Sequence, residues 1–224
     1  MTFLVGTRGS KLSLAQTNWV ISELKKENDD SEFKIKTIAT KGDTDSRALF
    51  TIDQKGIFEK EIDKAVAENE IDFAVHSLKD VPSDIAESLT IACIPTRESS
   101  NDIIITKDGS NLKTIQSGAV IGTSSLRRAV QISRIRQDVV VKPVRGNIET
   151  RVNKVTDGKF DAVILAEAGI SRLGLDVKHS ILSTKDFPPS PGQGALAIVC
   201  RADDEKTIST VSYTHLTLPT ILLV

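Results

Sequence analysis

Arginine is concentrated in one part of this sequence. Six of the eleven arginines lie between Arg127 and Arg151, and residues 123–151 hold seven Lys or Arg against two Asp or Glu, a local charge of 7 − 2 = +5. Two segments here, Gly122-Thr-Ser-Ser-Leu-Arg-Arg128 and Val144-Arg-Gly-Asn-Ile-Glu-Thr-Arg151, lead from an apolar, strand-like run into residues that commonly begin helices. A helix N-terminus already carries partial positive charge, so arginines are favourable there when an anion neutralises both. Free backbone N–H groups and arginine side chains therefore predict a site for a carboxylate or a phosphate.

The arginines at these two strand-to-helix junctions are predicted to bind the anion; they are Arg127, Arg128, Arg145 and Arg151. The alternative is a solvated helix face, and we adopt that interpretation for Arg134 and Arg136. The formal net charge of the whole chain is −1. A local basic patch on a nearly neutral protein favours a small acidic ligand over a nucleic acid.

A second polar group follows an apolar run and reads His76-Ser-Leu-Lys-Asp80. Pro82 comes two residues later and prevents a long helix. A carboxylate beside Lys79 and near arginines stays ionised, so Asp80 could hold a cationic intermediate or transfer a proton. From spacing alone, a loop carboxylate that accepts local amide hydrogen bonds is an equally good interpretation. A single histidine at a strand end, as His76 is, more often has a structural role.

Other kinds of site are not predicted. Paired metal-ligand spacings and glycine-rich nucleotide-binding motifs are absent from the sequence, and Ser124 and Ser125 are better explained as helix caps than as nucleophiles. Cys93 and Cys200 each end an apolar run, which indicates two buried thiols in a reducing compartment. There is no signal-peptide pattern and no apolar stretch of about 18 residues, so we expect a cytoplasmic protein that does not enter a membrane.

Strand and helix patterns alternate along the chain, which indicates an α/β fold with mainly parallel sheets. Helical spacing covers residues 12–26 and 57–68, and helical sequence follows three of the later strands. Ligands of such sheets collect at the carboxyl ends of strands, where the polar clusters fall. The predicted strands are residues 2–5, 33–39, 71–75, 89–93, 102–106, 120–123, 139–144, 162–166 and 195–200.

Two crossovers of the chain, near residues 94–101 and 188–194, predict two domains joined twice. Domain 1 comprises residues 1–95 and 194–210, and domain 2 comprises residues 100–189. We expect the polar clusters of both domains to face one cleft. Residues 211–224 carry no charge and show no helical period, so we expect a non-native-looking tail outside the fold.

Taken in order, these clusters resemble the hydroxymethylbilane synthase (porphobilinogen deaminase) family, which joins four porphobilinogen units in tetrapyrrole synthesis. The resemblance covers residues 3–206 and rests on several long motifs in a fixed order. The motifs are Gly6-Thr-Arg-Gly-Ser-Lys-Leu-Ser-Leu-Ala-Gln16, Lys55-Gly-Ile-Phe-Glu-Lys-Glu61, Asp72-Phe-Ala-Val-His-Ser-Leu-Lys-Asp-Val-Pro82, Gly122 to Arg128, Arg145 to Arg151, Ala166-Glu-Ala-Gly-Ile-Ser-Arg-Leu-Gly-Leu175 and Pro191-Gly-Gln-Gly-Ala195.

The resemblance implies two domains like those of type 2 periplasmic binding proteins, with a third, smaller C-terminal domain in the full family. It implies a transferase of heme biosynthesis whose small-molecule substrate is porphobilinogen, a pyrrole with acetate and propionate arms and an aminomethyl group. Ammonia leaves, an electrophilic methylene-pyrrole forms, and the free α-carbon of the growing chain attacks it. The implied cofactor is dipyrromethane, which has two pyrrole rings.

The resemblance also implies roles for individual residues. Asp80 matches the catalytic carboxylate, which would stabilise the positive charge that develops near the pyrrole N–H groups. Most of the other matching positions bind the carboxylate arms of cofactor and substrate; Lys55 is a further basic residue, Phe58 packs near the substrate ring, and Gln193 is a further candidate contact. The full set of expected binding residues is Arg8, Ser10, Lys55, Phe58, Lys79, Thr123, Ser125, Arg127, Arg128, Arg145, Arg151, Arg172 and Gln193.

The sequence departs from the family at the cofactor anchor. The resemblance implies a cysteine in a Gly-Gly-Cys motif of the third domain, and neither Cys93 nor Cys200 matches it. We therefore expect a truncated, monomeric chain without the third domain and with little or no activity. The alternative is a non-catalytic, two-lobed module that binds carboxylates or other anions.

Overall fold

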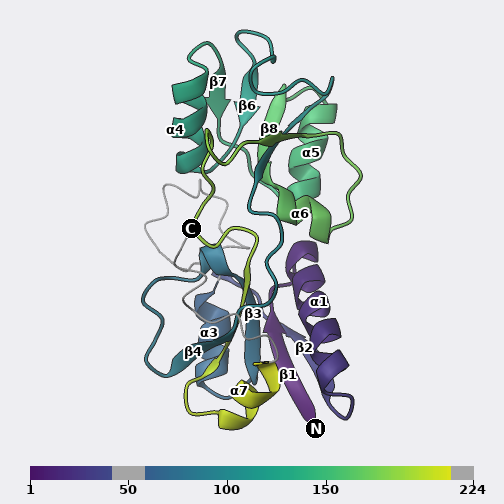
Figure 1. The fold of residues 1–224 in the computed structure, drawn as a ribbon, viewed down its shortest axis with the longest axis vertical. Coiled ribbons are helices and arrows are strands. Elements are labelled where there is room, and N and C mark those ends of the chain that lie inside the picture. Colours follow the sequence, from purple (N-terminus) through teal and green to yellow (C-terminus); the bar gives the residue numbers. More distant parts are fainter. Residues whose placement is uncertain (42–58, 213–224) are drawn as a thin grey trace. The chain divides into compact units, whose positions relative to one another are not determined.

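The computed structural model describes residues 1–41 and 59–212, and the chain folds as two compact units (Figure 1). Of the described residues, unit 1 contains 1–41, 59–98 and 194–212, and unit 2 contains 99–193. The chain therefore leaves unit 1 once and returns once. The double crossover that the sequence predicts is confirmed.

Unit 1 is built on a five-stranded sheet with the order β2-β1-β3-β10-β4. β1 runs parallel to β2 and β3, whereas β10 runs antiparallel to β3 and β4. Its elements are β1 (Thr2–Thr7), α1 (Lys11–Glu27), β2 (Glu32–Thr37), α3 (Lys60–Ala67), β3 (Phe73–Ser77), the short 3-10 helix η2 (Leu78–Asp80), β4 (Leu89–Cys93), β10 (Leu196–Arg201) and α7 (Glu205–Val211).

Unit 2 is built on a second five-stranded sheet with the order β7-β6-β8-β5-β9. β6 runs parallel to β7 and β8, whereas β5 runs antiparallel to β8 and β9. Its elements are β5 (Asp102–Thr106), β6 (Val120–Gly122), α4 (Leu126–Ile135), β7 (Val140–Lys142), α5 (Ile148–Thr156), β8 (Ala162–Ala166), α6 (Glu167–Arg172) and β9 (Ser180–Leu182).

Each sheet contains one strand that runs against its neighbours, and that strand directly follows a crossover. A reversed strand places its first residues beside the last residues of the adjacent strands. In unit 2, Asp102 at the start of β5 lies opposite Ala166 at the end of β8. In unit 1, Leu196 at the start of β10 lies opposite Ser77 at the end of β3. The reversed strands thus bring extra residues to the ligand-binding edge of an α/β sheet.

The core of unit 2 lies on both faces of its sheet because successive side chains of a strand point to opposite sides. Ile104 and Ile164 pack with Ile132 of α4 on one face. Ile103 and Val163 pack with residues of α5 and α6 on the other face. Figure 1 shows α4 on one side of the strands and α5 with α6 on the other. Strands buried on both faces read as continuous apolar runs, as β5 and β8 do.

Unit 1 follows the same rule. Val75 and Ile198 pack in one cluster with residues of α1 and α7. Ala74 and Val199, the neighbouring residues on the same strands, pack in a second cluster with residues of α3. The sheet of each unit is therefore covered by helices on both faces. The polar residues of the predicted site lie at the ends of the strands.

The predicted elements agree with the structure to different degrees: β3 lies two residues later than predicted, and β7 is three residues shorter than predicted. β4, β5 and β8 have the predicted bounds, and α1 extends one residue further at each end than predicted. β9 and α7 were not predicted because a three-residue edge strand and a seven-residue polar helix have too little periodicity. Val211, which the sequence assigns to the tail, is fully buried in the core of unit 1. The remaining tail, residues 213–224, lies outside the described residues.

A core substitution in α4 tests the two-faced packing of unit 2. Ile132 is fully buried between α4 and the sheet. We expect Ile132→Ala to lower the free energy of unfolding by about 2–5 kcal/mol, because it removes buried methyl groups and leaves a cavity. Val130→Ala on the same helix is the control; its side chain is 59% exposed, so the change should stay within about 0.5 kcal/mol. Equal effects of the two variants in urea unfolding would contradict the packing described here.

Candidate functional site

The loop between β6 and α4 is shaped by three consecutive hydroxyl residues. Thr123 is buried, and its Oγ1 accepts a hydrogen bond from the backbone N–H of Ser125 at 3.2 Å. Ser125 is the N-cap of α4, and its Oγ accepts a hydrogen bond from the backbone N–H of Arg128 at 3.4 Å. These bonds satisfy backbone donors that a helix start leaves open. They explain why Thr and Ser at these positions deliver Arg127 and Arg128 on the first turn of the helix.

The next loop, between β7 and α5, is joined to the first one. Ser124 Oγ donates to the carbonyl of Val144 at 2.6 Å and accepts from the Val144 N–H at 3.2 Å. Asn147 is the N-cap of α5, and its Oδ1 accepts from the backbone N–H of Thr150 at 2.8 Å. The two strand-to-helix loops of the arginine-rich region therefore lie side by side, as their equivalent positions in a parallel sheet require.

Three arginines from these loops and helices lie close enough to affect one another. Burial, followed by the positive charges of Arg128 and Arg145, lowers the pKa of Arg151 below its ordinary value. The Nε of Arg151 donates to the carbonyl of Gly146 at 2.8 Å, which holds the side chain over its own loop. Like charges gathered in a partly buried place are unfavourable unless an anion shares the site. This part of unit 2 is therefore suited to bind an acidic ligand.

Arg127 and Arg128 both contact one carboxylate that sequence reasoning did not single out. Asp102, the first residue of β5, is fully buried. Its Oδ2 accepts from Arg127 NH2 at 2.7 Å, and its Oδ1 accepts from Arg128 NH2 at 2.7 Å and from Arg128 Nε at 3.1 Å. The guanidinium of Arg128 also donates to the carbonyl of Ile164 at 3.1 Å, and the side chain is almost completely buried. The sequence predicts that Arg127 and Arg128 bind a ligand. The structure shows that both side chains also donate hydrogen bonds to Asp102 within the protein.

Gln193 lies in the same network. It is buried, and its Nε2 donates to the carbonyl of Ser100 at 2.8 Å and to Asp102 Oδ1 at 2.9 Å. Its Oε1 lies 3.5 Å from Arg128 NH2. Gln193 thus has hydrogen-bond partners within the protein at the second crossover. The ligand contact that the sequence suggests stays a prediction. Arg172, at the last position of α6, is partly exposed.

The unit 1 residues of the predicted site lie at the carboxyl ends of β1 and β3. Ser10 is the N-cap of α1, and its Oγ accepts from the backbone N–H of Ser13 at 3.2 Å. Arg8 lies in the loop before it and is partly exposed. Lys79 and Asp80 are exposed on η2, which directly follows β3 and ends before Pro82 as predicted. Asp80 is therefore carried on a tight turn with its carboxylate open to solvent.

His76 has the structural role that its position favoured. It is 6% exposed on β3, and its Nε2 lies 3.0 Å from Asp63 Oδ1 of α3. This pair joins the strand to the helix that covers it. Two other predicted site residues, Lys55 and Phe58, lie outside the described residues.

The two cysteines are buried and not joined by a disulfide, as the sequence indicates. Burial, followed by the negative charge of Asp204, raises the pKa of the Cys200 thiol to about 11. A neutral, buried thiol is a poor nucleophile at physiological pH. Cys200 is therefore part of the unit 1 core.

A cavity of about 860 Å³ in unit 2 does not coincide with the predicted site. Its walls include Gln131 and Pro188, which also contact Arg127, together with Ile135, Ile181 and Phe187. Among the described residues, no group of three or more His, Cys, Asp or Glu side chains could hold a metal ion. In that same part of the chain, every helix is too short or too polar to traverse a bilayer.

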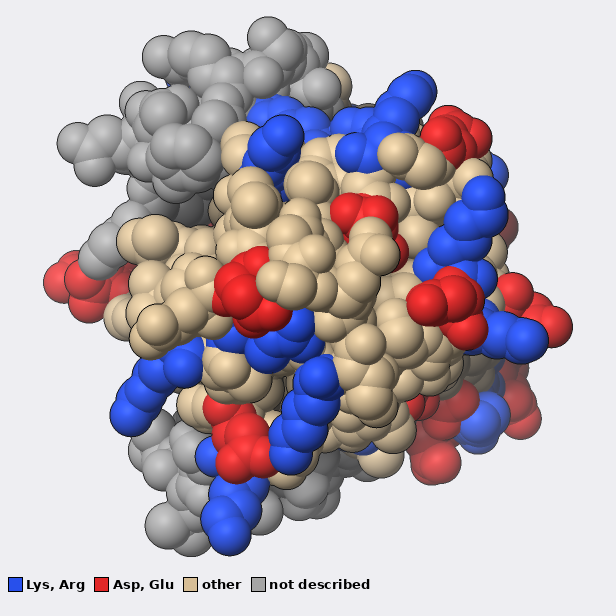
Figure 2. Space-filling model, turned by 90° about the horizontal axis from the view of Figure 1, so that it is seen from above, with Lys and Arg blue, Asp and Glu red and all other residues tan. Residues whose placement is uncertain are grey.

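Charged side chains are mixed on the surface that Figure 2 presents, where Lys and Arg alternate with Asp and Glu. The basic residues of that face therefore lie next to acidic ones. This differs from the surroundings of Arg151, where the neighbouring charges that act on the side chain are two further arginines.

Gly146 is required by the loop that positions Arg151. Its φ is +110°, and a Cβ at this position would lie 2.6 Å from Thr150 Cγ2 and 2.8 Å from Thr150 Cβ. We expect Gly146→Ala to lower the free energy of unfolding by more than about 1 kcal/mol, because it adds a clash to an unfavourable φ. Gly158→Ala is the matched control: its φ is +72°, and no atom lies within 4 Å of the added Cβ. If thermal unfolding showed the two variants to be equally stable, the close approach at Thr150 would be wrong.

The buried thiol predicts a dependence of stability on alkaline pH. The folded-state pKa of Cys200 is raised from 9.0 to about 11. The stabilisation is therefore complete below pH 9 and is lost as the pH rises through the folded-state value. We expect the free energy of unfolding to fall more steeply between pH 9 and pH 11 in the unmodified protein than in Cys200→Ala. Denaturant titrations across this range measure both slopes, and identical slopes would show that Cys200 does not titrate in this way.

Comparison with known proteins supplies the family. Residues 3–209 match the family model described as "Porphobilinogen deaminase, dipyromethane cofactor binding domain". Over 208 residues the chain is 69% identical to a probable porphobilinogen deaminase of Nitrosopumilus maritimus, covering 93% of this chain and 67% of that protein. Over 207 residues it is 46% identical to the porphobilinogen deaminase of Brevibacillus brevis, covering 92% of this chain and 67% of that protein. The chain thus spans 67% of the length of each of these two relatives.

The fold is shared more widely. A periplasmic binding protein of Salmonella typhimurium with high arginine specificity superimposes with a TM-score of 0.52 at 12% sequence identity, covering 94% of this chain and 90% of that one. This likeness confirms the predicted α/β fold of the type 2 periplasmic binding proteins. The family match and the sequence identities show that the chain belongs to the porphobilinogen deaminase family.

Proposed function

We propose that this chain supplies the substrate- and cofactor-binding residues for the chemistry of a hydroxymethylbilane synthase, the deaminating condensation of four porphobilinogen molecules into a linear tetrapyrrole. The observation that carries the proposal beyond family membership is the group formed by Arg128, Arg145 and Arg151 in unit 2. Burial and the charges of the other two arginines lower the pKa of Arg151. A group of arginines at two strand-to-helix loops fits a ligand with several carboxylates.

Porphobilinogen and its condensation products are ligands of that kind, because each pyrrole unit carries an acetate and a propionate arm. Arginine suits such arms because its planar guanidinium can donate two parallel hydrogen bonds to one carboxylate. The N-termini of α4 and α5 add partial positive charge at the same edge of the sheet. We assign carboxylate binding in unit 2 to Arg127, Arg128, Arg145 and Arg151, with Thr123 and Ser125 shaping the loop.

The same residues fit the dipyrromethane cofactor of the family, because that group also carries carboxylate arms. When bound, dipyrromethane supplies the free pyrrole α-carbon at which the chain is extended. Arg128, Arg145 and Arg151 would hold its arms, and the pKa of Arg151, lowered by burial and by the charges of the other two arginines, supports this assignment. Lys79 and Arg8 of unit 1 are proposed to bind further arms.

Asp80 is proposed as the catalytic carboxylate. It is exposed on η2, and none of the described residues donates a hydrogen bond to its carboxylate. A carboxylate that accepts no hydrogen bond from these residues can stabilise positive charge as it develops at a pyrrole nitrogen. Ser10, Arg172 and Gln193 remain predicted ligand contacts, as do Lys55 and Phe58. A cytoplasmic location and a monomeric state also remain predictions.

The role of Asp80 is tested by Asp80→Asn. We expect porphobilinogen consumption to fall by at least about a hundredfold, because the variant removes the negative charge that would face the developing cation. The assay uses this chain completed with the part of its Nitrosopumilus maritimus relative that it does not match, since the chain spans 67% of that protein. Porphobilinogen affinity and thermal stability should change little. A variant that consumes porphobilinogen at the normal rate would overturn this role.

The arginine group is tested by Arg151→Gln. We expect the Kd for porphobilinogen, measured by calorimetry, to rise about tenfold or more, as loss of a hydrogen bond to a charged group implies. Arg134→Gln is the control, because Arg134 is exposed on α4 and lies outside the group. If both variants bound porphobilinogen equally well, or if the unmodified protein bound simple phosphate but no porphobilinogen, the proposed function would be wrong.

A further inference from the structure

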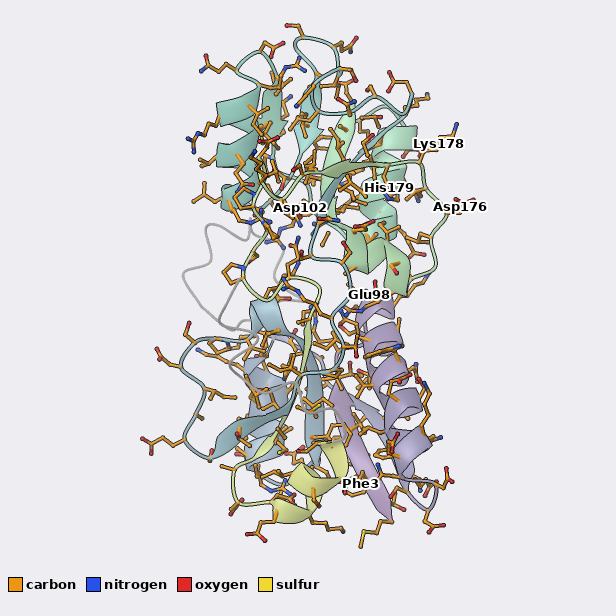
Figure 3. The ribbon with its side chains drawn as sticks, in the orientation of Figure 1. Phe3, Glu98, Asp102, Asp176, Lys178 and His179 are labelled. Atoms are coloured by element: carbon orange, nitrogen blue, oxygen red, sulfur yellow. The ribbon has the colours of Figure 1, made fainter. Side chains whose placement is uncertain are left out.

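Asp102 owes its position to the direction of β5. Because this strand is antiparallel to β8, its first residue lies opposite Ala166 at the carboxyl end of β8. The same end of the sheet carries the loop from which α4 begins. An acidic side chain is thus placed beside the arginine-bearing helix start, and Figure 3 labels it. Asp102 is 0% exposed, so its charge has to be satisfied by the protein.

The carboxylate of Asp102 accepts hydrogen bonds from three side chains. Arg127 NH2 donates to Oδ2 at 2.7 Å, and Arg128 donates to Oδ1 through both NH2 and Nε. Gln193 Nε2 donates to Oδ1 at 2.9 Å, and it also donates to the carbonyl of Ser100. The position of the carboxylate is therefore defined from β5, from α4 and from the second crossover.

This arrangement offsets an unfavourable local charge. Arg127 and Arg128 are adjacent on the first turn of α4, where the helix dipole opposes cations. One buried carboxylate cancels part of their mutual repulsion and leaves an excess of one positive charge among the three groups. The excess remains available for an external anion, while the internal pairing makes the two arginines compatible with folding.

The geometry also determines which donors of Arg127 stay open. Arg127 has five N–H groups. Three hydrogen bonds within the protein use NH1 toward Pro188 O at 2.7 Å, NH1 toward Gln131 Oε1 at 3.2 Å and NH2 toward Asp102. The described part of the chain therefore leaves 5 − 3 = 2 N–H groups for a ligand, on a side chain that is 25% exposed.

We propose that Asp102 is a positioning residue: it holds the guanidinium groups of Arg127 and Arg128 so that the two open N–H groups of Arg127 are presented to a substrate carboxylate. This inference rests on the proposed function, because it concerns the binding of an acidic substrate. It assigns to Asp102 no contact with the substrate itself. Its effect passes through Arg127, and that makes it distinguishable from a purely structural role.

A double-mutant cycle tests the proposal with the chain as it stands. Asp102→Asn keeps the shape of the side chain and removes its charge, and Arg127→Gln removes the guanidinium. We expect each single variant to raise the Kd for porphobilinogen about tenfold, and the double variant to raise it little further, because the two residues act as one unit. Independent effects would multiply to about a hundredfold, and that result would overturn the proposal.

Asp138→Asn is the matched control. Asp138 also pairs with an arginine of unit 2, since Arg136 Nε and NH2 donate to its two oxygens at 2.7 Å and 2.8 Å. Loss of this pair should change the melting temperature without changing the Kd for porphobilinogen by more than about twofold. A loss of affinity as large as that of Asp102→Asn would show that any broken Arg–Asp pair in unit 2 weakens binding.

A second measurement keeps the proposal separate from the proposed function. Nuclear magnetic resonance of the arginine side chains reports whether the Arg127 guanidinium rotates freely. We expect restricted rotation in the unmodified protein and in Asp138→Asn, and free rotation in Asp102→Asn. If Arg127 stays restricted in Asp102→Asn, the proposal is wrong whether or not the protein binds porphobilinogen. If Arg127 is released but the unmodified protein does not bind porphobilinogen, the proposed function fails while the positioning role stands.

If Asp102→Asn does not fold, Asp102→Glu replaces it. This variant retains the charge and shifts the carboxylate by one methylene, so it tests position alone. We expect weaker porphobilinogen binding, by about tenfold, with Arg127 released in the resonance experiment. Binding as tight as in the unmodified protein would overturn the proposal.

Discussion

Bringing positive charges together at two helix N-termini is the interaction on which the rest of this structure depends. Arg128, Arg145 and Arg151 lie close enough for the first two to lower the pKa of the third. Neither mutual repulsion nor the helix dipole favours that arrangement. It persists because the backbone around it is fixed by other bonds, chiefly the caps at Ser125 and Asn147 and the burial of apolar side chains on both faces of the sheet. The core thus holds the arginines in a place that suits an acidic ligand.

The reversed strand in each sheet adds residues to the ligand-binding edge of that sheet. A purely parallel sheet offers only its carboxyl-terminal loops to a ligand. The reversed strands β5 and β10 add their first residues to the same edge, and in unit 2 this delivers Asp102 to the arginines. In unit 1 the carbonyl of Ala195, just before β10, accepts a hydrogen bond from Leu78 at 3.0 Å and so supports the turn that carries Asp80. In each unit, the strand that follows a crossover therefore contributes to the ligand-binding edge of its own sheet.

Local features of the site could be predicted from the sequence, and contacts between distant residues could not. Ser125 and Asn147 predict where α4 and α5 begin, because a capping side chain bonds to a backbone N–H only three residues later. β5 is predicted from its three consecutive isoleucines, Ile103 to Ile105. The pairing of Asp102 with Arg127 depends instead on β5 being antiparallel, and strand direction is a property of the whole sheet. The sequence does show an acidic residue, Asp102, at the start of β5. It does not show which residue Asp102 pairs with.

Asp80 and Asp102 show how the fold gives one residue type two different tasks. Asp102 has no exposed surface, and its oxygens accept hydrogen bonds from two arginines and a glutamine. A carboxylate engaged in this way can orient its partners, but it has little remaining capacity to respond to a new charge. Asp80 is exposed on a three-residue turn, and no described side chain or backbone group donates to its carboxylate. Stabilising a transient cation requires an anion that the protein has not already neutralised. Among the contacts of residues 1–41 and 59–212, only Asp80 of these two aspartates meets that requirement, so the difference in their surroundings supports catalysis by Asp80 and positioning by Asp102.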